Sequence, residues 1–241
     1  MLDQILGEFF GTMMLIILGN GAVASVLLKK SKGHEAGWIA ITTGWFIAVV
    51  IAVFVAQSVG SPNADINPAI SFAKYWWNTY TLHKMLLFMG AQVAGAFVGA
   101  VVVWLVYFPH WKETDDAHTK LQVFSTYPAI RAFRHNLISE IIATAVLVLG
   151  VAAIFSKATL GGPVNGLGPY LVGILVWGIG LSLGGATGYA INPARDFGPR
   201  LAHTLLPIAG KGSSDWSYAW VPIVGPLLGG VLAAWIWHWV G

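Results

Sequence analysis

The tripeptide Asn-Pro-Ala occurs twice in the chain, as Asn67-Pro68-Ala69 and as Asn192-Pro193-Ala194. Asn followed by Pro is typical of a helix start. The Asn oxygen accepts from backbone N–H groups one turn on, and the missing N–H of Pro costs nothing at the first helical position. An Asn that caps through its oxygen keeps its NH₂ group as a donor. Each copy therefore predicts a donor beside the positive end of a helix, where the dipole is worth about half an elementary charge.

Three charged residues stand inside or beside apolar runs. Glu8 begins EFFGTMMLIILG, Glu140 begins EIIATAVLVLG, and Arg195 directly follows the second Asn-Pro-Ala. Charges in such places are costly in a bilayer and are usually functional. The two glutamates could relay protons, or they could accept hydrogen bonds from exposed backbone N–H groups of nearby loops. We favour the second interpretation.

The elements that carry these residues are expected to cross a membrane. Of 241 residues, 56% are hydrophobic and 10% are charged, whereas a soluble domain carries about 25% charge. The mean hydropathy is +0.71. Helices of about 20 apolar residues span a bilayer. The sequence predicts six such spans, at roughly 5–28, 37–58, 84–108, 135–156, 168–187 and 218–240.

Composition also excludes several classes of protein. The chain has no cysteine, so it offers neither disulfides nor thiol chemistry. The sequence pI of about 9.2 reflects a small charge surplus without a basic run suited to nucleic acid. The seven histidines are scattered without the spacing of a metal site or of a nucleophile with its base. We therefore do not expect an enzyme.

Two further apolar segments, 67–77 and 192–203, are too short to span and begin at the repeated tripeptides. The glutamate runs, the tripeptides and two Gly-xxx-Gly patterns recur in one order, at offsets of 125 to 132 positions. Short interrupted segments at corresponding places in two halves point to discontinuous helices that line a site at mid-membrane. Since each half holds three spans, the second half is expected to be inverted relative to the first.

We expect one channel-like domain over residues 1–241. Its first repeat covers about 1–108, its linking loop about 109–134 and its second repeat about 135–241. A second polar connection is expected at 157–169.

The chain resembles the aquaporin superfamily, also called the major intrinsic proteins, along its whole length. The second motif reads NPARDFGPR, and this motif, together with FSTYP at 124–128, is similar to the glycerol-facilitator or aquaglyceroporin branch. The resemblance implies an all-α fold of six transmembrane helices and two re-entrant half-helices. It also implies a homotetramer with one pore per subunit, no cofactor, and a place in the plasma membrane with both termini in the cytoplasm.

The resemblance also assigns residues to the pore. Arg195 matches the arginine of the family's selectivity filter, Tyr189 its aromatic wall, which is often Phe, and Trp45 the remaining wall. Gly180 matches the small residue that widens a glycerol filter, where water-specific members tend to carry His. Two rings opposite a cation would suit a polyol, whose carbons face the rings and whose hydroxyls face the guanidinium.

Three acidic residues are expected to support the re-entrant loops, namely Glu8, Glu140 and Asp196, which follows Arg195. A fourth departs from the family pattern. Two positions before the first Asn-Pro-Ala the family commonly has His, and this chain has Asp65. Asp65 could favour cations at the inner mouth, or it could cap or pair within its own loop, which is the interpretation that we favour.

The function expected from these residues is passive passage of glycerol, water and other small uncharged polar solutes, with ions and protons excluded. We extend it to protonated small weak acids such as lactic acid. One alternative is an ion- or proton-coupled secondary transporter that uses Glu8 and Glu140. Another is a water-only channel, against which Gly180 argues because it has no side chain to narrow the opening.

The distribution of Lys and Arg conflicts with an orientation that places both termini in the cytoplasm. With both termini inside, nine basic residues lie outside and only Lys74, Lys84 and Lys157 lie inside, against the usual excess of positive charge in the cytoplasm. A basic outer face could gather organic anions near the mouth, or it could be solubility charge only. We favour the second interpretation.

Overall fold

The computed structural model describes residues 1–156 and 166–240, and every element in this part of the chain is a helix. The helices are α1 (Leu2–Leu27), α2 (Gly37–Val59), α3 (Pro68–Trp76), α4 (Leu82–Val106), α5 (His110–Glu113), α6 (Ala117–Phe124), α7 (Phe133–Ile154), α8 (Leu167–Ser182), α9 (Pro193–Leu205), α10 (Trp216–Ala219) and α11 (Val221–Val240).

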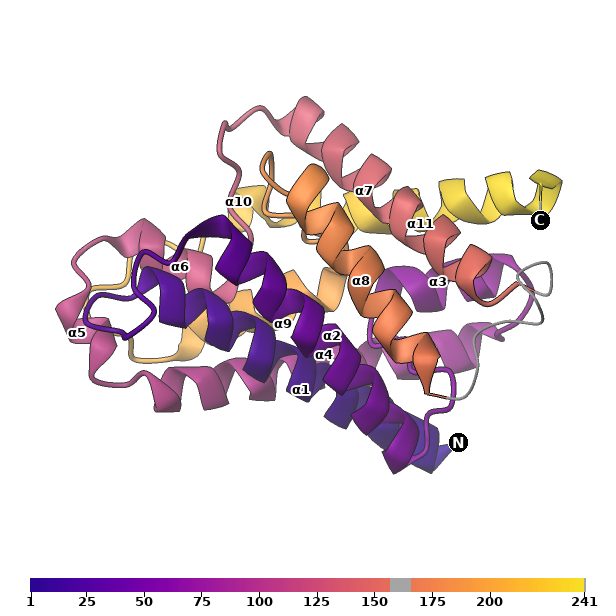
Figure 1. The fold of residues 1–241 in the computed structure, drawn as a ribbon, viewed down its shortest axis with the longest axis horizontal. Coiled ribbons are helices and arrows are strands. Elements are labelled where there is room, and N and C mark those ends of the chain that lie inside the picture. Colours follow the sequence, from indigo (N-terminus) through magenta and orange to yellow (C-terminus); the bar gives the residue numbers. More distant parts are fainter. Residues whose placement is uncertain (157–165, 241) are drawn as a thin grey trace.

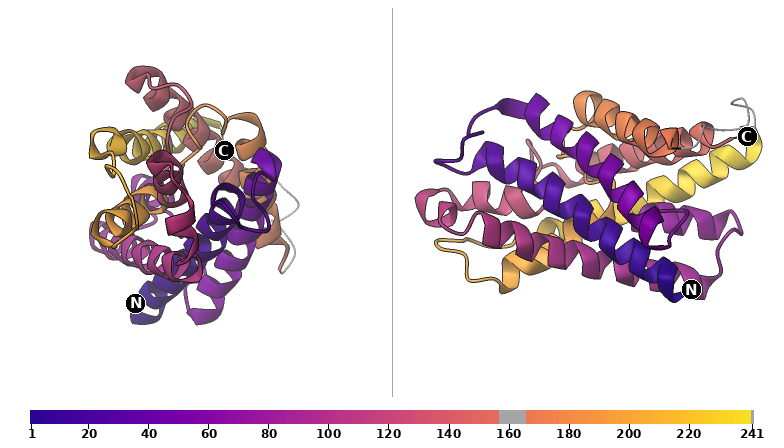
Figure 2. Two further views of the ribbon diagram at one scale, coloured as in Figure 1. Left: turned by 90° about the vertical axis from the view of Figure 1, so that its left-hand side faces the viewer. Right: turned by 60° about the horizontal axis from the view of Figure 1, so that its bottom comes forward.

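Six long helices, α1, α2, α4, α7, α8 and α11, run along the long axis of the molecule (Figures 1 and 2). Five segments are long and apolar enough to cross a bilayer, the last of them formed by α10 and α11 together. The sixth helix, α8, has 16 residues, which rise about 24 Å. It ends at Ser182, earlier than the 187 expected, before a turn that contains two glycines, which are poor helix formers. The all-helical membrane fold predicted from the sequence is confirmed.

The two halves of the chain pack in the same pattern. In the first half α1 packs against α2 and α4, and in the second half α7 packs against α8 and α11. Small residues permit the closest approaches. A Cβ added at Gly95 of α4 would lie 2.2 Å from the carbonyl oxygen of Phe9, and one at Gly229 of α11 would lie 2.4 Å from that of Ile141. Close packing of this kind is typical of helices in membranes.

The short helices α3 and α9 are the two re-entrant segments. Both begin at a proline that follows a capping Asn, and they have 9 and 13 residues, too few to cross a bilayer. Each lies against the last long helix of the other half, α3 on α11 and α9 on α4, and the two contact each other. The two halves are therefore interlocked through α3 and α9.

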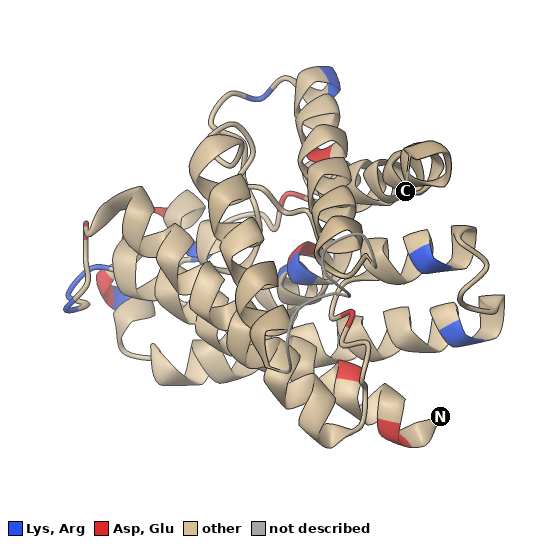
Figure 3. Cartoon of the chain, turned by 45° about the vertical axis from the view of Figure 1, so that its right-hand side comes forward, with Lys and Arg blue, Asp and Glu red and all other residues tan. Residues whose placement is uncertain are grey.

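The loops gather at two ends. Both termini lie at one end of the molecule, and α5 and α6 lie at the opposite end (Figure 1). The linking loop expected at 109–134 contains these two short helices. Charged residues are sparse along the long helices, and several lie in the loops at the end away from the termini (Figure 3). Of the polar connection expected at 157–169, residues 157–165 lie outside the described part of the chain.

Candidate functional site

The two capping asparagines meet where α3 and α9 begin. The side-chain oxygen of Asn67 accepts from the Ala69 N–H at 2.9 Å, and that of Asn192 accepts from Ala194 at 3.0 Å and from Arg195 at 3.2 Å. Their NH₂ groups reach across the boundary between the halves. Each amide donates one N–H to the opposite loop, as described next. The second N–H of each amide is left to point into the space between the two helices.

The cross-bonds are symmetric. Asn67 Nδ2 donates to the carbonyl of Ile191 at 2.8 Å, and Asn192 Nδ2 donates to that of Ile66 at 2.9 Å. The two carbonyls belong to the residues directly before each asparagine. Both asparagines line one cavity, where two helix N-termini converge. The positive ends of two helices and two spare amide hydrogens thus face the same lumen.

The loops before the asparagines are held in an unusual backbone conformation. Ile66 and Ile191 have φ values of +45° and +43°, and the residues two places earlier, Ala64 and Tyr189, have +41° and +38°. A β-branched residue at positive φ is a genuine outlier, and strain of this kind costs on the order of 1–3 kcal/mol at each residue. It persists only where surrounding contacts impose it.

Glu8 supplies those contacts in the first loop. One carboxylate oxygen accepts from the Asp65 N–H at 2.9 Å and from the Ser61 hydroxyl at 2.6 Å. The other accepts from the Ile66 N–H at 2.7 Å and from the Gln92 amide at 2.8 Å. The glutamate is fully buried, so every one of these bonds replaces hydration that the bilayer withholds.

Glu140 does the same in the second loop. Its oxygens accept from the Thr187 hydroxyl at 2.6 Å, from the Ala190 N–H at 3.0 Å and from the Ile191 N–H at 2.9 Å. Neither glutamate lines either of the two cavities described below. The hydrogen bonds of both glutamates therefore hold the re-entrant loops in place.

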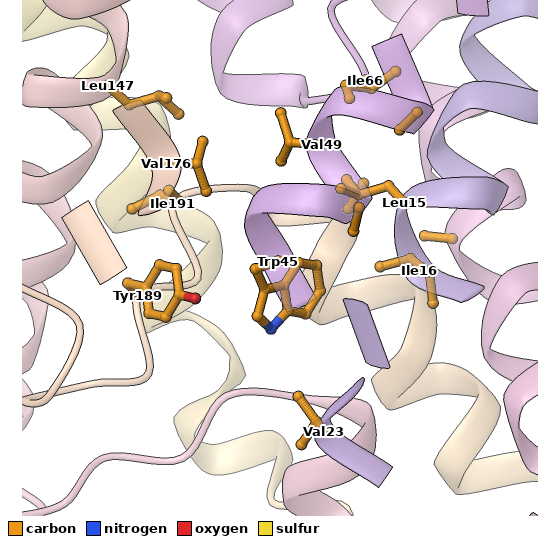
Figure 4. Close-up of a cluster of buried hydrophobic side chains, with 14 of the residues drawn as sticks. Leu15, Ile16, Val23, Trp45, Val49, Ile66, Leu147, Val176, Tyr189 and Ile191 are labelled. Carbon is orange, nitrogen blue, oxygen red and sulfur yellow. The ribbon is translucent and has the colours of Figure 1, made fainter. Parts of the chain in front are cut away.

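Two cavities lie in line along the molecule. One of about 400 Å³ extends from the asparagines towards the end that holds the termini, and one of about 350 Å³ opens beside the loop that follows α6. Three residues line both cavities, namely Trp45 of α2, Tyr189 before α9 and Arg195 of α9. They mark the place where the cavities meet, and Figure 4 shows the two side chains next to each other, with the hydroxyl end of Tyr189 on the side of Trp45.

Arg195 is fixed by groups from other elements. Its Nη1 donates to the Asn20 side-chain oxygen at 3.3 Å and to the Phe124 carbonyl at 3.2 Å, and Asn20 itself donates to that carbonyl at 3.1 Å. The guanidinium carbon lies 4.3 Å from the centre of the Trp45 ring, within the range of a cation–π interaction. No acceptor among the described residues takes the remaining guanidinium N–H groups, so a solute in the constriction can meet them.

Gly180 lies behind Tyr189 and lines neither cavity. A Cβ at this position would lie 2.8 Å from Cζ of the Tyr189 ring and 2.9 Å from its hydroxyl oxygen. The Trp38 indole N–H donates to the Gly180 carbonyl at 3.0 Å. The space that the missing side chain leaves is therefore occupied by the end of the tyrosine ring.

Asp65 is tied into its own half of the molecule. It accepts from the Ser71 hydroxyl at 2.8 Å and forms an ion pair with Lys74, so it joins the loop to the first and second turns of α3. The Asp65 side chain is fully buried, whereas that of Lys74 is 19% exposed, and both residues line the cavity of about 400 Å³. The acid thus faces the lumen with a cation beside it.

Asp196 plays a corresponding part in the other half. Its carboxylate accepts from the backbone N–H and hydroxyl of Thr126 at 2.8 and 2.7 Å, and it forms a buried ion pair with Arg200 at 2.7 Å. Arg200 also donates to the Ser214 carbonyl at 2.8 Å. These bonds anchor α9 to the loop after α6 and to the chain before α10.

Most of the basic residues at the end of α5 and α6 are engaged in loop structure. Lys29 and Lys30 pair with Asp115 and Glu113, and Arg131 pairs with Asp215. Lys120 donates to a loop carbonyl, and Lys211 donates to three carbonyls at the end of α9, at 2.6 to 2.9 Å. Burial lowers the pKa of Lys120 and of Lys211 from that of an ordinary lysine. This surface therefore carries less free positive charge than its number of lysines and arginines suggests.

Sequence reasoning missed the residues that hold the charged groups. Asn20 carries a signal, because a polar amide inside an otherwise apolar span usually faces the bundle interior. Ser61 and Thr187 sit at corresponding places in the two loops, but a hydroxyl in a loop is too common to single out. The Phe124 carbonyl carries no signal, since backbone acceptors exist at every residue.

Both the sequence and the fold are similar to those of known proteins. The family model of the major intrinsic protein matches residues 1–237. The chain is 55% identical to a probable glycerol uptake facilitator protein of Thermotoga maritima, over 98% of both chains. It is 38% identical to a D/L-lactic acid transporter of Lactiplantibacillus plantarum, over 99% of this chain and 98% of that one. The solved structure of the aquaglyceroporin from Plasmodium falciparum superposes with a TM-score of 0.87 at 28% identity, covering 99% of this chain and 96% of that one.

Proposed function

The chain belongs to the major intrinsic protein family, and we propose that it forms a passive membrane channel for glycerol, water and other small uncharged polar solutes. One observation carries the proposal. Two cavities share Trp45, Tyr189 and Arg195 as lining residues, so these three side chains form a polar constriction between them. Relatives named glycerol uptake facilitators support glycerol as a solute. The chain acts as a channel and not as an enzyme.

Selection takes place at two levels of the lumen. Trp45, Gly180, Tyr189 and Arg195 form the selectivity filter, in which Gly180 acts through the ring that it accommodates. Below it, the spare amide hydrogens of Asn67 and Asn192 hold passing hydroxyl or water oxygens. The converging N-termini of α3 and α9 repel cations and protons, and Arg195 adds to that field.

The alternative, a coupled transporter that uses the membrane glutamates, has less support. Every hydrogen bond of Glu8 and Glu140 goes to loop or helix groups, and the side chains are fully buried away from both cavities. A carboxylate engaged in this way has no route to a travelling proton. We assign both to support of the re-entrant loops, with Asp196 in the same role for α9.

Stopped-flow light scattering on proteoliposomes tests the function. Vesicles with the protein should reswell in glycerol much faster than empty vesicles, with a rate proportional to the glycerol gradient. Imposing a proton gradient and then collapsing it should leave the rate unchanged. Accumulation of glycerol above equilibrium, or flux that follows the proton gradient, would refute the channel and favour the transporter.

Small weak acids in their protonated form are a second class of solute, for which the lactic acid transporter among the relatives is the supporting observation. Lactic acid is close to glycerol in size and hydroxyl content. The lactate anion would have to give up its hydration to enter the narrow pore, a cost that the neutral acid largely avoids. The pairing of the outer lysines and arginines gives no support to anion gathering at the mouth.

The channel is proposed to work as a homotetramer in the plasma membrane, as one pseudo-symmetric domain with both termini in the cytoplasm. The two termini lie at one end, as an even number of crossings requires (Figure 1). The outer lysines and arginines are used to hold loops together, so their number is a poor guide to orientation. Protease access to tags at each terminus in intact cells tests the orientation, and mass measurement in detergent tests the tetramer.

A further inference from the structure

The ammonium group of Lys74 lies at the end of the larger cavity that is away from the constriction. Lys74 lines that cavity, about two turns along α3 from the capping Asn67, which corresponds to about 10 Å. Its side chain is 19% exposed, whereas the Asp65 side chain with which it pairs is fully buried. A solute at this end of the lumen therefore meets the ammonium group before the carboxylate.

The ion pair leaves Lys74 with donors to spare. An ammonium group has three N–H donors, and among the described residues Nζ of Lys74 donates to Asp65 alone. The Asp65 carboxylate also accepts from the Ser71 hydroxyl at 2.8 Å. Gln92, which donates to Glu8, donates to the same hydroxyl at 3.0 Å. The two acids are thus held behind the lysine by buried donors, and two of its N–H groups are left for a ligand.

A neutral donor lies close to this lysine. Asn63 lines the same cavity and donates one N–H to the Tyr80 hydroxyl at 2.9 Å. The centre of the Tyr80 ring is 5.5 Å from Nζ of Lys74, so Tyr80 connects the two donors. The amide of Asn63 keeps a second N–H. One charged and one neutral donor therefore share the wall of a cavity of about 400 Å³, which has room for a small molecule.

We propose that this end of the cavity is a binding site for small carboxylate anions such as lactate, with Lys74 as its charged donor and Asn63 as a neutral one. An anion held here occupies the lumen without crossing it, because it would have to give up its hydration to go further. It therefore slows the passage of neutral solutes. The inference rests on the proposed channel function and adds an inhibitory ligand to it. A weak acid that crosses in neutral form and then ionises would supply that ligand.

The test measures glycerol permeability of proteoliposomes at pH 7.5, where lactic acid is almost fully ionised. Potassium lactate replaces potassium chloride on both sides of the membrane at constant ionic strength, so the orientation of the protein does not matter. Half-inhibition is expected on the order of 10–100 mM, because a small ligand with one ion pair binds weakly. At about 100 mM lactate the permeability should fall roughly two- to tenfold. Lactamide, the neutral analogue, should leave it nearly unchanged.

The decisive variant combines Asp65→Asn with Lys74→Gln, since Lys74→Gln alone would leave a buried acid without its partner. Relative to its own flux without lactate, this double variant should lose the inhibition, whereas Lys74→Arg keeps the charge and should retain it. Lys84→Gln is the matched control. It removes an ammonium group that lies 4.2 Å from the centre of the Tyr80 ring but lines neither cavity, so its inhibition should equal that of the unmodified protein.

Three results would overturn the inference. They are a flux in the unmodified protein that lactate leaves unchanged, equal inhibition in the double variant, and loss of inhibition in Lys84→Gln to the same extent as in the double variant. The last would mean that surface charge at this end acts in general, without a site at Lys74. If the unmodified protein passes no glycerol even without lactate, the proposed function fails instead, which is a separate result.

Discussion

Replacement of Gly180 by Ala should narrow the constriction without adding a group to the lumen. The new Cβ would stand 2.8 Å from Cζ of Tyr189 and 3.0 Å from Cγ2 of Thr42. Nonbonded carbon atoms rest at about 3.5–4.0 Å, so the ring has to retreat by roughly 1 Å. Trp38 and Gly184 lie against other parts of the ring, and the lumen is the open direction.

The size of the effect follows from overpacking. A solute that fills the constriction would meet a wall moved by that distance, and contacts of this kind cost about 1–3 kcal/mol. Added to the barrier for glycerol, this corresponds to a loss of roughly 5- to 150-fold in flux. Water is the smaller solute and should pass at nearly its former rate.

The assay measures water and glycerol permeability by stopped-flow light scattering on the same proteoliposomes. Gly178→Ala is the matched control, because it lies on the same helix and an added Cβ there meets open space. Glycerol flux that survives in correctly assembled Gly180→Ala would refute the coupling of Gly180 to the ring. Loss of water and glycerol together would show that Gly180 serves helix packing instead.

Three further outcomes are expected. Arg195→Val should admit a measurable cation leak while water flow persists, because it removes a fixed positive charge from the constriction, and electrical recording on planar bilayers would detect the leak; a variant as tight as the parent would contradict this role. Glu140→Gln should lower the thermal unfolding midpoint in detergent, since the amide cannot accept all the bonds from Thr187, Ala190 and Ile191, at a cost of about 1–3 kcal/mol; an unchanged midpoint would remove its supporting role. Lactic acid flux should rise as external pH falls towards the pKa of the acid, and flux that is flat with pH would exclude the protonated acid as the permeant.

Several features of the fold depend only on residues that are close together in the sequence. The starts of α3 and α9 could be predicted, because a cap is made by an Asn and the backbone two or three residues on. The long spans could be predicted for a similar reason, since the bilayer sets both their length and their composition. The end of α8 at Ser182 was misplaced by five residues, because the apolar pattern continues past the turn where the helix stops.

Partners that come from distant parts of the chain could not be predicted. Nothing near Arg195 in the sequence indicates that Asn20 and the Phe124 carbonyl, 175 and 71 positions away, orient its guanidinium. The spare amide of Asn67 could be anticipated, but its bond to the Ile191 carbonyl depends on how the two halves interlock. Packing brings such groups together, and a linear pattern carries no record of it.

The sequence by itself determined that this chain crosses a membrane, that its two halves repeat, and that two helices begin at paired asparagines, because composition, periodicity and capping all act over short distances. The tertiary structure decided what fills the space that Gly180 leaves beside the constriction. A glycine in the sequence signifies a missing side chain, and only the packed ring of Tyr189 reveals whether the space stays empty. The same holds for the outer lysines, whose effect at the mouth depends on acids and carbonyls that folding brings within reach.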